Sequence, residues 1–294
     1  MTGFTPPGVR LKRMVETKSS RGARITWPLY LLFFLVAGIM GAIISWGFLT
    51  ESLAVLGIPD PGPITTAGLP LLRAGAWLLA ALSVGSFLFA SFLLSPRQGD
   101  IRRAYLTVDG LIASRTGAVA ALVFALIGII MVPLVLSDVS GQPITEAMKP
   151  ANWLVALNQV ADAQAWLISA MIALVVGGAA LIAPRTWMWQ PVWLVGAILI
   201  VAPQGLSGHS AAGGDHDYGT NSLLWHVLFM MLWVGGLMAL IAHGRRLGPN
   251  LQVAVRRYST IAATSMVAMA ISGVINAAIR VRFEDLFTSD YGRV

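Results

Sequence analysis

Seven long apolar stretches constrain this chain more than any other feature of its sequence. Each has the roughly 20 mostly apolar residues that an α-helix needs to cross a bilayer, and none alternates as strands of a membrane barrel do. With 56% hydrophobic and 11% charged residues, the chain has more apolar surface than a soluble domain can bury. We therefore predict an all-α, polytopic transmembrane helix bundle. The predicted spans are Pro28–Leu49, Leu71–Leu94, Thr116–Leu136, Ala163–Ala183, Trp187–Gly205, Ser222–Ala242 and Ser259–Ile279.

The charges between the stretches predict the orientation of the bundle. Most of the 20 Lys and Arg residues lie in the N-terminal arm and in alternate loops, whereas the other loops carry acidic residues such as Asp60 and Asp138. Because cytoplasmic loops are enriched in Lys and Arg, the N-terminus is predicted to be cytoplasmic. We expect a basic cytoplasmic arm over 1–27, a transmembrane helical domain over 28–281 and an extracytoplasmic tail over 282–294.

The net charge of +7 is also explained by the membrane topology. Its basic residues form short clusters that flank apolar stretches, which is the pattern of membrane topology and not of a nucleic-acid-binding face. We therefore expect no nucleic-acid partner.

The chain contains no cysteine, which narrows its chemistry. Disulfides, thiolate metal sites and cysteine nucleophiles are excluded. Binding of a soft metal would depend on His and Met, with carboxylates in support. No Ser-His-Asp set, paired-carboxylate site, phosphate-binding loop or His-Glu-x-x-His motif stands out, so we do not expect an enzyme.

The candidate chemistry lies in the predicted outer loop after the fifth stretch. His209 and His216 lie on this Gly- and Ser-rich loop, and His226 follows at the outer end of the sixth span. Neutral imidazole binds copper, zinc, nickel or iron. Asp215 and Asp217 flank His216 and could bind an ion directly or orient an imidazole. The pattern predicts a metal site at the outer face.

Met230 follows His226 by four residues, so both lie on one face of a helix. An imidazole together with a thioether favours copper over zinc, because thioether is a soft ligand suited to Cu(I). Zinc stays open as an alternative metal. Met230 also has a second interpretation, as a flexible side chain that fills a gap between helices.

Two amide side chains are candidates for shaping the site. Gln204 precedes the outer loop, and Asn276 lies near the outer end of the seventh span, at a depth similar to that of His226. An intramembrane Asn is costly without a hydrogen bond, so Asn276 should face the bundle interior, in the site or in helix packing. His243 lies about 25 Å from His226 along the helix and cannot share its site; we expect it to lie at the membrane interface.

Three local expectations concern packing. Arg73, at the outer end of the second span, is expected to reach the interface or to pair with Glu51. The segment that begins at Pro150 is expected to form a short surface helix. Small residues such as Gly177 and Gly235 would let helices approach closely.

Several short motifs in the last third of the chain, roughly Gln204 to Val294, form a series. They are Gly208-His209, Leu224-Trp225-His226, Trp233-Val-Gly235-Gly236-Leu237, Ser272-Gly273-Val-Ile-Asn276 and Asp290-Tyr291-Gly292-Arg293. The series resembles the CopD family of bacterial copper-handling membrane proteins. The resemblance implies a multi-pass protein of the bacterial inner (plasma) membrane, associated with copper uptake or delivery. The resemblance implies that His209 and His226 correspond to the family's outer-loop and helix histidines. His216 is an additional candidate.

The resemblance also bears on the end of the chain. Related long chains fuse such a module to a second membrane domain that resembles the CtaG-type cytochrome c oxidase assembly factors. A stop shortly after Tyr291 is what a fragment of such a fusion, or a module without its final helix, would have.

Our leading hypothesis is therefore copper binding at the extracytoplasmic face, for import of copper or its delivery to a membrane cuproenzyme. The expected partners are the lipid bilayer, an extracytoplasmic copper carrier, and a membrane oxidase or its assembly factor. Two alternatives stay open. One is a haem- or quinone-linked electron carrier, in which His226 with His209 or His216 would hold a b-type haem. The other is a non-catalytic assembly or scaffold subunit.

Overall fold

All regular structure in the described residues is helical. The computed structural model describes residues 59–94, 104–207 and 224–280, with only the backbone for 276–280, and parts of 31–43. Within these ranges the single β-type pairing is an isolated bridge between Tyr105 and Thr186. The predicted all-α architecture is confirmed. The main helices are α2 (Pro63–Leu88), α3 (Val108–Ser140), α4 (Ile144–Ala147), α5 (Pro150–Gln159), α6 (Ala161–Ile182), α7 (Gln190–Leu199), α8 (Ala202–Leu206), α10 (Gly236–His243) and α11 (Leu251–Arg280).

Six helical segments in the described part of the chain are long and apolar enough to cross a membrane. They correspond to the last six predicted spans. The predicted span Pro28–Leu49 lies largely outside the described residues, and its described parts are helical. The six segments are Pro63–Leu93, Val108–Ser140, Ala161–Ile182, Trp187–Leu206, Leu224–Arg246 and Gly248–Ile275.

Several helices extend beyond the predicted apolar limits. The second span begins at Pro63 and not after Pro70, so the helix runs through that proline. Proline removes one helical hydrogen bond, a loss that packing of α2 against α3 outweighs. The third span covers 33 residues, because its polar ends continue the helix past the apolar core. The helix predicted to begin at Pro150 is α5, and most of its residues are exposed or partly exposed.

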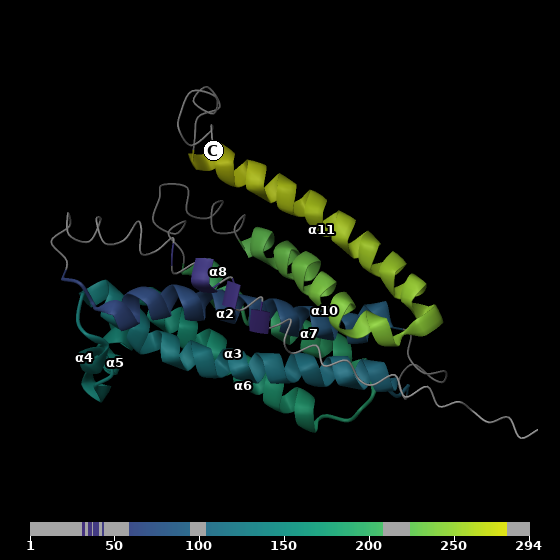
Figure 1. Cartoon of the computed structure of the whole chain (residues 1–294), viewed down its shortest axis with the longest axis horizontal. Coiled ribbons are helices and arrows are strands. Elements are labelled where there is room, and N and C mark those ends of the chain that lie inside the picture. Colours follow the sequence, from purple (N-terminus) through teal and green to yellow (C-terminus); the bar gives the residue numbers. More distant parts are fainter. Residues whose placement is uncertain are drawn as a thin grey trace, which may run out of the picture.

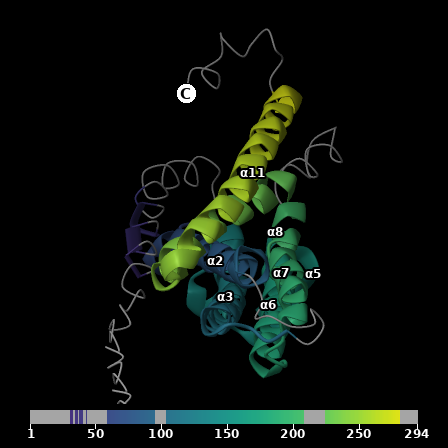
Figure 2. The same ribbon diagram turned by 90° about the vertical axis from the view of Figure 1, so that its right-hand side faces the viewer.

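The bundle has a central group and a margin. In the central helix α2 and its continuation, 78% of the most apolar window is buried, whereas in the span that contains α11 only 17% is buried. α3 lies between α2 and α6 and packs extensively against both of them. Figures 1 and 2 show α11 on the outside of this group, next to α10. The span Leu224–Arg246 lies between the central group and α11.

A close contact of two glycines brings the span Leu224–Arg246 against α2. A Cβ on Gly85 would overlap the backbone of Gly235, and one on Gly235 would overlap the backbone of Ala81. Only residues without a side chain permit this approach. The predicted role of Gly235 is confirmed, as is that of Gly177, which faces the carbonyl of Ala118. The same expectation for Gly178 is wrong, because a Cβ there would meet nothing within 4 Å.

Two π-helical turns lie near this contact, η1 (Phe89–Leu93) after α2 and η4 (Met231–Gly235) before α10. A π turn leaves backbone carbonyls out of the regular helical ladder. The Tyr258 hydroxyl donates to the carbonyl of Trp233 at 3.0 Å. The Arg257 guanidinium donates to the carbonyls of Phe92 and Leu93 at 3.3 and 3.4 Å. α11 therefore supplies donors to both irregular turns.

The loops that join the helices lie at two opposite ends of the bundle. The basic loops lie at one end, and the loop with α4 and α5 lies at the other. At one end the loops before α3 and before α7 are joined by backbone hydrogen bonds, from Leu106 to Arg185 at 3.0 Å and from Trp187 to Ala104 at 2.8 Å. The Trp187 indole donates to the carbonyl of Ser91 at 3.0 Å. These basic connections form the predicted cytoplasmic end.

The opposite, predicted outer end carries α4 and α5 (Figure 1). Here Arg73 pairs with Asp162 at 2.8 Å, because the first turn of α6 lies beside the outer part of α2. The sequence did not indicate this partner. Glu51, the partner considered from the sequence, lies outside the described residues.

Candidate metal site at the outer end of the bundle

His226 lies in the first described turn of the span Leu224–Arg246 and is partly exposed. Its Nδ1 atom is 3.1 Å from the hydroxyl oxygen of Ser272 on α11. The Ser272 hydroxyl donates its own hydrogen to the carbonyl of Met269 at 2.8 Å. A neutral imidazole that donates from Nδ1 to this hydroxyl would keep its lone pair on Nε2.

In that tautomer the Nε2 lone pair of His226 would be available for a metal. A metal-binding imidazole commonly has its other nitrogen held by a hydrogen bond, which fixes both the tautomer and the ring orientation. The contact of Nδ1 with Ser272 is of this kind.

Gly273 leaves room beside the same ring. A Cβ at this position would meet no neighbour nearer than Cε1 of His226, at 3.9 Å. Cε1 lies between the two ring nitrogens. Because Gly273 has no side chain, α11 leaves the space next to this edge of the ring unfilled. The Ser272-Gly273 pair therefore supplies a hydrogen bond to the ring and space next to it.

Met230 lies one turn further along the helix from His226. It is partly buried and packs against the hydrophobic core of the bundle. This environment suits its gap-filling interpretation, and the ligand role stays a prediction.

Gln204 lies in the short helix α8, where the chain enters the predicted outer loop. Its Nε2 atom is buried and has no hydrogen-bond partner, which leaves a donor that a ligand or water can satisfy. The neighbouring Gly205 packs against Leu224, since a Cβ there would be 3.1 Å from the Leu224 side chain. The start of the predicted loop therefore lies against the residue two positions before His226.

The remaining predicted site residues are less well defined. The backbone of Asn276 belongs to α11, one turn beyond Ser272, and its side chain lies outside the described part. No group of three His, Asp or Glu side chains comes together in the part of the chain that the structure describes. The predicted residues outside that part are His209, His216, Asp215 and Asp217.

His243 lies at the other end of the same span, as predicted. It is 5% exposed, and its ring packs against Phe89 with 5.3 Å between the centroids. The histidine is thus buried in the bundle and not exposed at the membrane interface.

Ser272 is the neighbour of His226 that sequence reasoning missed. It belongs to the Ser272-Gly273 motif, but hydropathy does not identify which residues of two spans face each other. The signal that could have found it is a small hydroxyl residue in an apolar helix, at a depth similar to that of His226.

Comparison with known families matches two segments of the chain. The family described as "Copper resistance protein D-like, N-terminal domain" matches residues 64–218, which include Gln204, His209 and His216. The family described as "Copper resistance protein D" matches residues 252–294, which include Ser272 and Asn276. His226 lies between the two matches. The family likeness therefore extends well beyond the last third, where the sequence motifs indicated it.

A curated relative is an uncharacterized protein of Mycobacterium leprae (strain TN). It is 27% identical over 195 residues, which are 65% of this chain and 29% of the relative. The chain therefore spans less than a third of that relative's length. No solved structure matches the chain. The matches to its two segments show that the chain belongs to the copper resistance protein D (CopD) family, whose function in the membrane is related to copper resistance.

Proposed function

We propose that the protein binds copper at the extracytoplasmic face and serves copper import or the delivery of copper to a membrane cuproenzyme. The observation that carries this proposal is the His226–Ser272 hydrogen bond, which engages Nδ1 and would leave Nε2 for a metal, at the end of the bundle opposite the basic loops. Membership of the CopD family supports copper as the metal. Copper is the cargo in this proposal.

The chain offers further ligands close to His226. The contact between Gly205 and Leu224 ties together the two ends of the loop that carries His209 and His216. His209 follows Gly205 by only four residues, so at about 3.5 Å per extended residue its Cα lies within about 14 Å of Gly205. We propose His209 as a second ligand, with His216 and Met230 as additional ones. Asp215 and Asp217 would support the site, and Gln204 and Asn276 would shape it.

The ligand types favour copper over harder cations. Without cysteine, the available donors are imidazole, thioether and carboxylate. Imidazole suits copper and zinc, and thioether suits Cu(I). Capture at the outer face of a bacterial inner membrane would require copper from an extracytoplasmic carrier, and a membrane oxidase or its assembly factor would be the recipient.

Cellular copper content tests the function. Cells that express the wild-type chain, His226→Ala or His243→Ala would be grown with trace copper, and total copper and oxidase activity would be measured. Import predicts higher cell copper for wild type and His243→Ala than for His226→Ala. Delivery predicts higher oxidase activity for wild type and His243→Ala than for His226→Ala, with the same total cell copper in all three. Equal values for all three inserted proteins would contradict both and favour a scaffold role.

A further inference from the structure

A basic pocket lies at the cytoplasmic end of the bundle, opposite the proposed copper site. It has a volume of about 270 Å³ and is formed by the start of α3, the end of α6 and the start of α7. Its polar lining comprises Ser114, Arg115, Arg185 and Gln190. The volume is just below the usual range for pockets of small organic ligands, which suits a group of modest size.

Among the described residues, the pocket lining carries two positive charges and no carboxylate. Neither Arg115 nor Arg185 forms an ion pair within the described ranges, and both are exposed at the pocket. Asp109, in the first turn of α3, is not part of the lining. Arginine presents several N–H donors in a planar fork that matches the oxygens of a phosphate. The pocket therefore suits an anion and disfavours a cation.

Gln190 supplies independent evidence for a ligand. Its side chain is 2% exposed, and its Oε1 atom is buried without any hydrogen-bond partner. A buried amide oxygen without a partner is costly. Because the side chain lines the pocket, a ligand or water in the pocket is what can satisfy it. The hydroxyls of a glycerol-type headgroup are suitable donors for Oε1, and phosphate oxygens are suitable acceptors for the amide N–H groups.

The backbone of Arg185 is held in place without a ligand. Its carbonyl accepts from the N–H of Leu106 at 3.0 Å, and the next residue, Thr186, pairs with Tyr105. The loop between α6 and α7 is therefore tied to the segment before α3. A site held by backbone hydrogen bonds needs little ordering when an anion binds.

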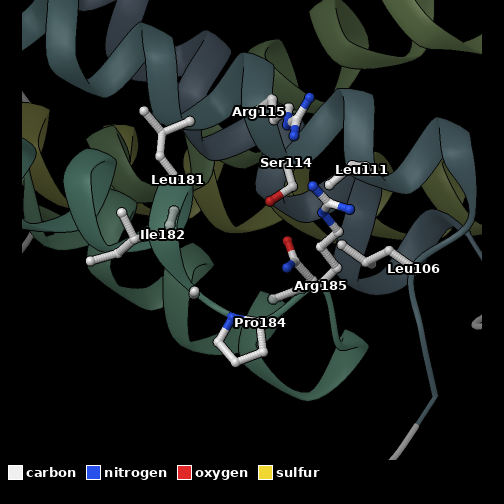
Figure 3. A pocket seen from close by; sticks show the side chains of 11 residues that line it. Leu106, Leu111, Ser114, Arg115, Leu181, Ile182, Pro184 and Arg185 are labelled. Carbon is white, nitrogen blue, oxygen red and sulfur yellow. The ribbon is translucent and has the colours of Figure 1, made fainter.

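The other side of the pocket is apolar and open to lipid. Leu181 and Ile182 line it and are 44% and 87% exposed, at the end of a membrane span. In the view of Figure 3, the side chains of Ser114, Arg115 and Arg185 gather on one side, with Leu181 and Ile182 on the other. A basic, hydrogen-bonding group next to an exposed apolar edge matches the junction of a phospholipid headgroup and its acyl chains.

We propose that this pocket binds the phosphate headgroup of an anionic glycerophospholipid from the cytoplasmic leaflet. The two arginines contact the phosphate, Gln190 contacts the polar headgroup, and the acyl chains extend along Leu181 and Ile182. A zwitterionic lipid is disfavoured because the described lining residues offer no carboxylate for its ammonium group. Free phosphate shares the headgroup chemistry but leaves the apolar edge unused.

Native mass spectrometry of the delipidated, detergent-purified protein tests this proposal. Phosphatidylglycerol, phosphatidylcholine and inorganic phosphate are added separately to wild type, to Arg115→Gln/Arg185→Gln, and to Arg245→Gln/Arg256→Gln. The last variant is the matched control, since it removes two exposed cytoplasmic arginines outside the pocket. Wild type and control should bind phosphatidylglycerol in preference to phosphatidylcholine, and the pocket variant should bind it about tenfold or more weakly.

Two results would overturn the proposal. Equal losses in the pocket and control variants would indicate a general attraction to basic loops. Binding of inorganic phosphate that depends on the pocket, without preferential binding of phosphatidylglycerol, would assign the site to a soluble phosphate.

A labelling experiment on the wild-type protein does not depend on the folding of a variant. A photoreactive phosphatidylglycerol should label peptides that contain residues 106–115 or 180–190. Labelling confined to other peptides would contradict the proposal.

Discussion

The hydroxyl of Ser272 lies 3.1 Å from Nδ1 of His226 and joins two membrane spans at their outer ends. That hydroxyl also donates to the carbonyl of Met269. In the proposed copper site, this contact would engage Nδ1 and leave Nε2 for the metal. The first prediction tests this relationship.

Ser272→Ala should weaken copper binding without abolishing it. The imidazole would lose the partner that fixes its tautomer and orientation, and loss of such a partner typically costs 10–100-fold in metal affinity. The dissociation constant can be measured by competition with a chromogenic Cu(I) chelator. Ser259→Ala, at an exposed position of the same helix, should leave the affinity unchanged. An unchanged affinity for Ser272→Ala would show that the hydrogen bond does not orient a ligand.

Gly235→Ala should destabilise the bundle. The added methyl group would overlap the backbone of Ala81, and overpacking of this kind typically costs about 1–3 kcal/mol. Thermal unfolding in detergent, followed by circular dichroism, measures the effect. Gly178→Ala is the matched control because a Cβ there meets nothing within 4 Å. A loss of stability for Gly178→Ala as large as that for Gly235→Ala would contradict the close approach of α2 and the span Leu224–Arg246.

The pair Arg73–Asp162 should contribute little to stability. Both side chains are more than a third exposed, at 41% and 36%, so solvent screens their attraction. A double-mutant cycle with Arg73→Gln and Asp162→Asn should give a coupling of about 1 kcal/mol or less. A coupling of several kcal/mol would mean that the pair is shielded from water.

Orientation can be tested with single cysteines because the native chain has none. Lys149→Cys and Arg246→Cys lie at opposite ends of the bundle, and both positions are exposed. A membrane-impermeant maleimide should label Lys149→Cys in spheroplasts and label Arg246→Cys only after the membrane is opened. The reverse pattern would invert the topology and move the proposed copper site to the cytoplasmic face.

Hydropathy predicted the six described spans because crossing a bilayer requires a long apolar helix. It did not predict the ends, since the polar residues around Asp109 and Asp138 continue α3 beyond its apolar centre. Hydropathy also could not predict the π turns at Phe89–Leu93 and Met231–Gly235. An apolar segment has the same hydropathy whether it forms an α-helical or a π-helical turn.

The site was predicted less completely than the fold. His226 could be identified from its residue type and its place at a span end. Ser272 could not, because a contact between two spans depends on the rotation of each helix. The pocket around Arg115 and Arg185 combines three separate segments, and its basic residues appeared in the sequence only as topology signals.

Metal binding by the purified protein tests the central claim most directly. Wild type and His226→Ala would be exposed to copper and zinc in competition, and bound metal would be measured after removal of the excess. We predict that wild type retains copper in preference to zinc, and that His226→Ala, folded as judged by circular dichroism, loses it. Stoichiometric copper retained by His226→Ala, or no copper retained by wild type, would contradict the outer copper site.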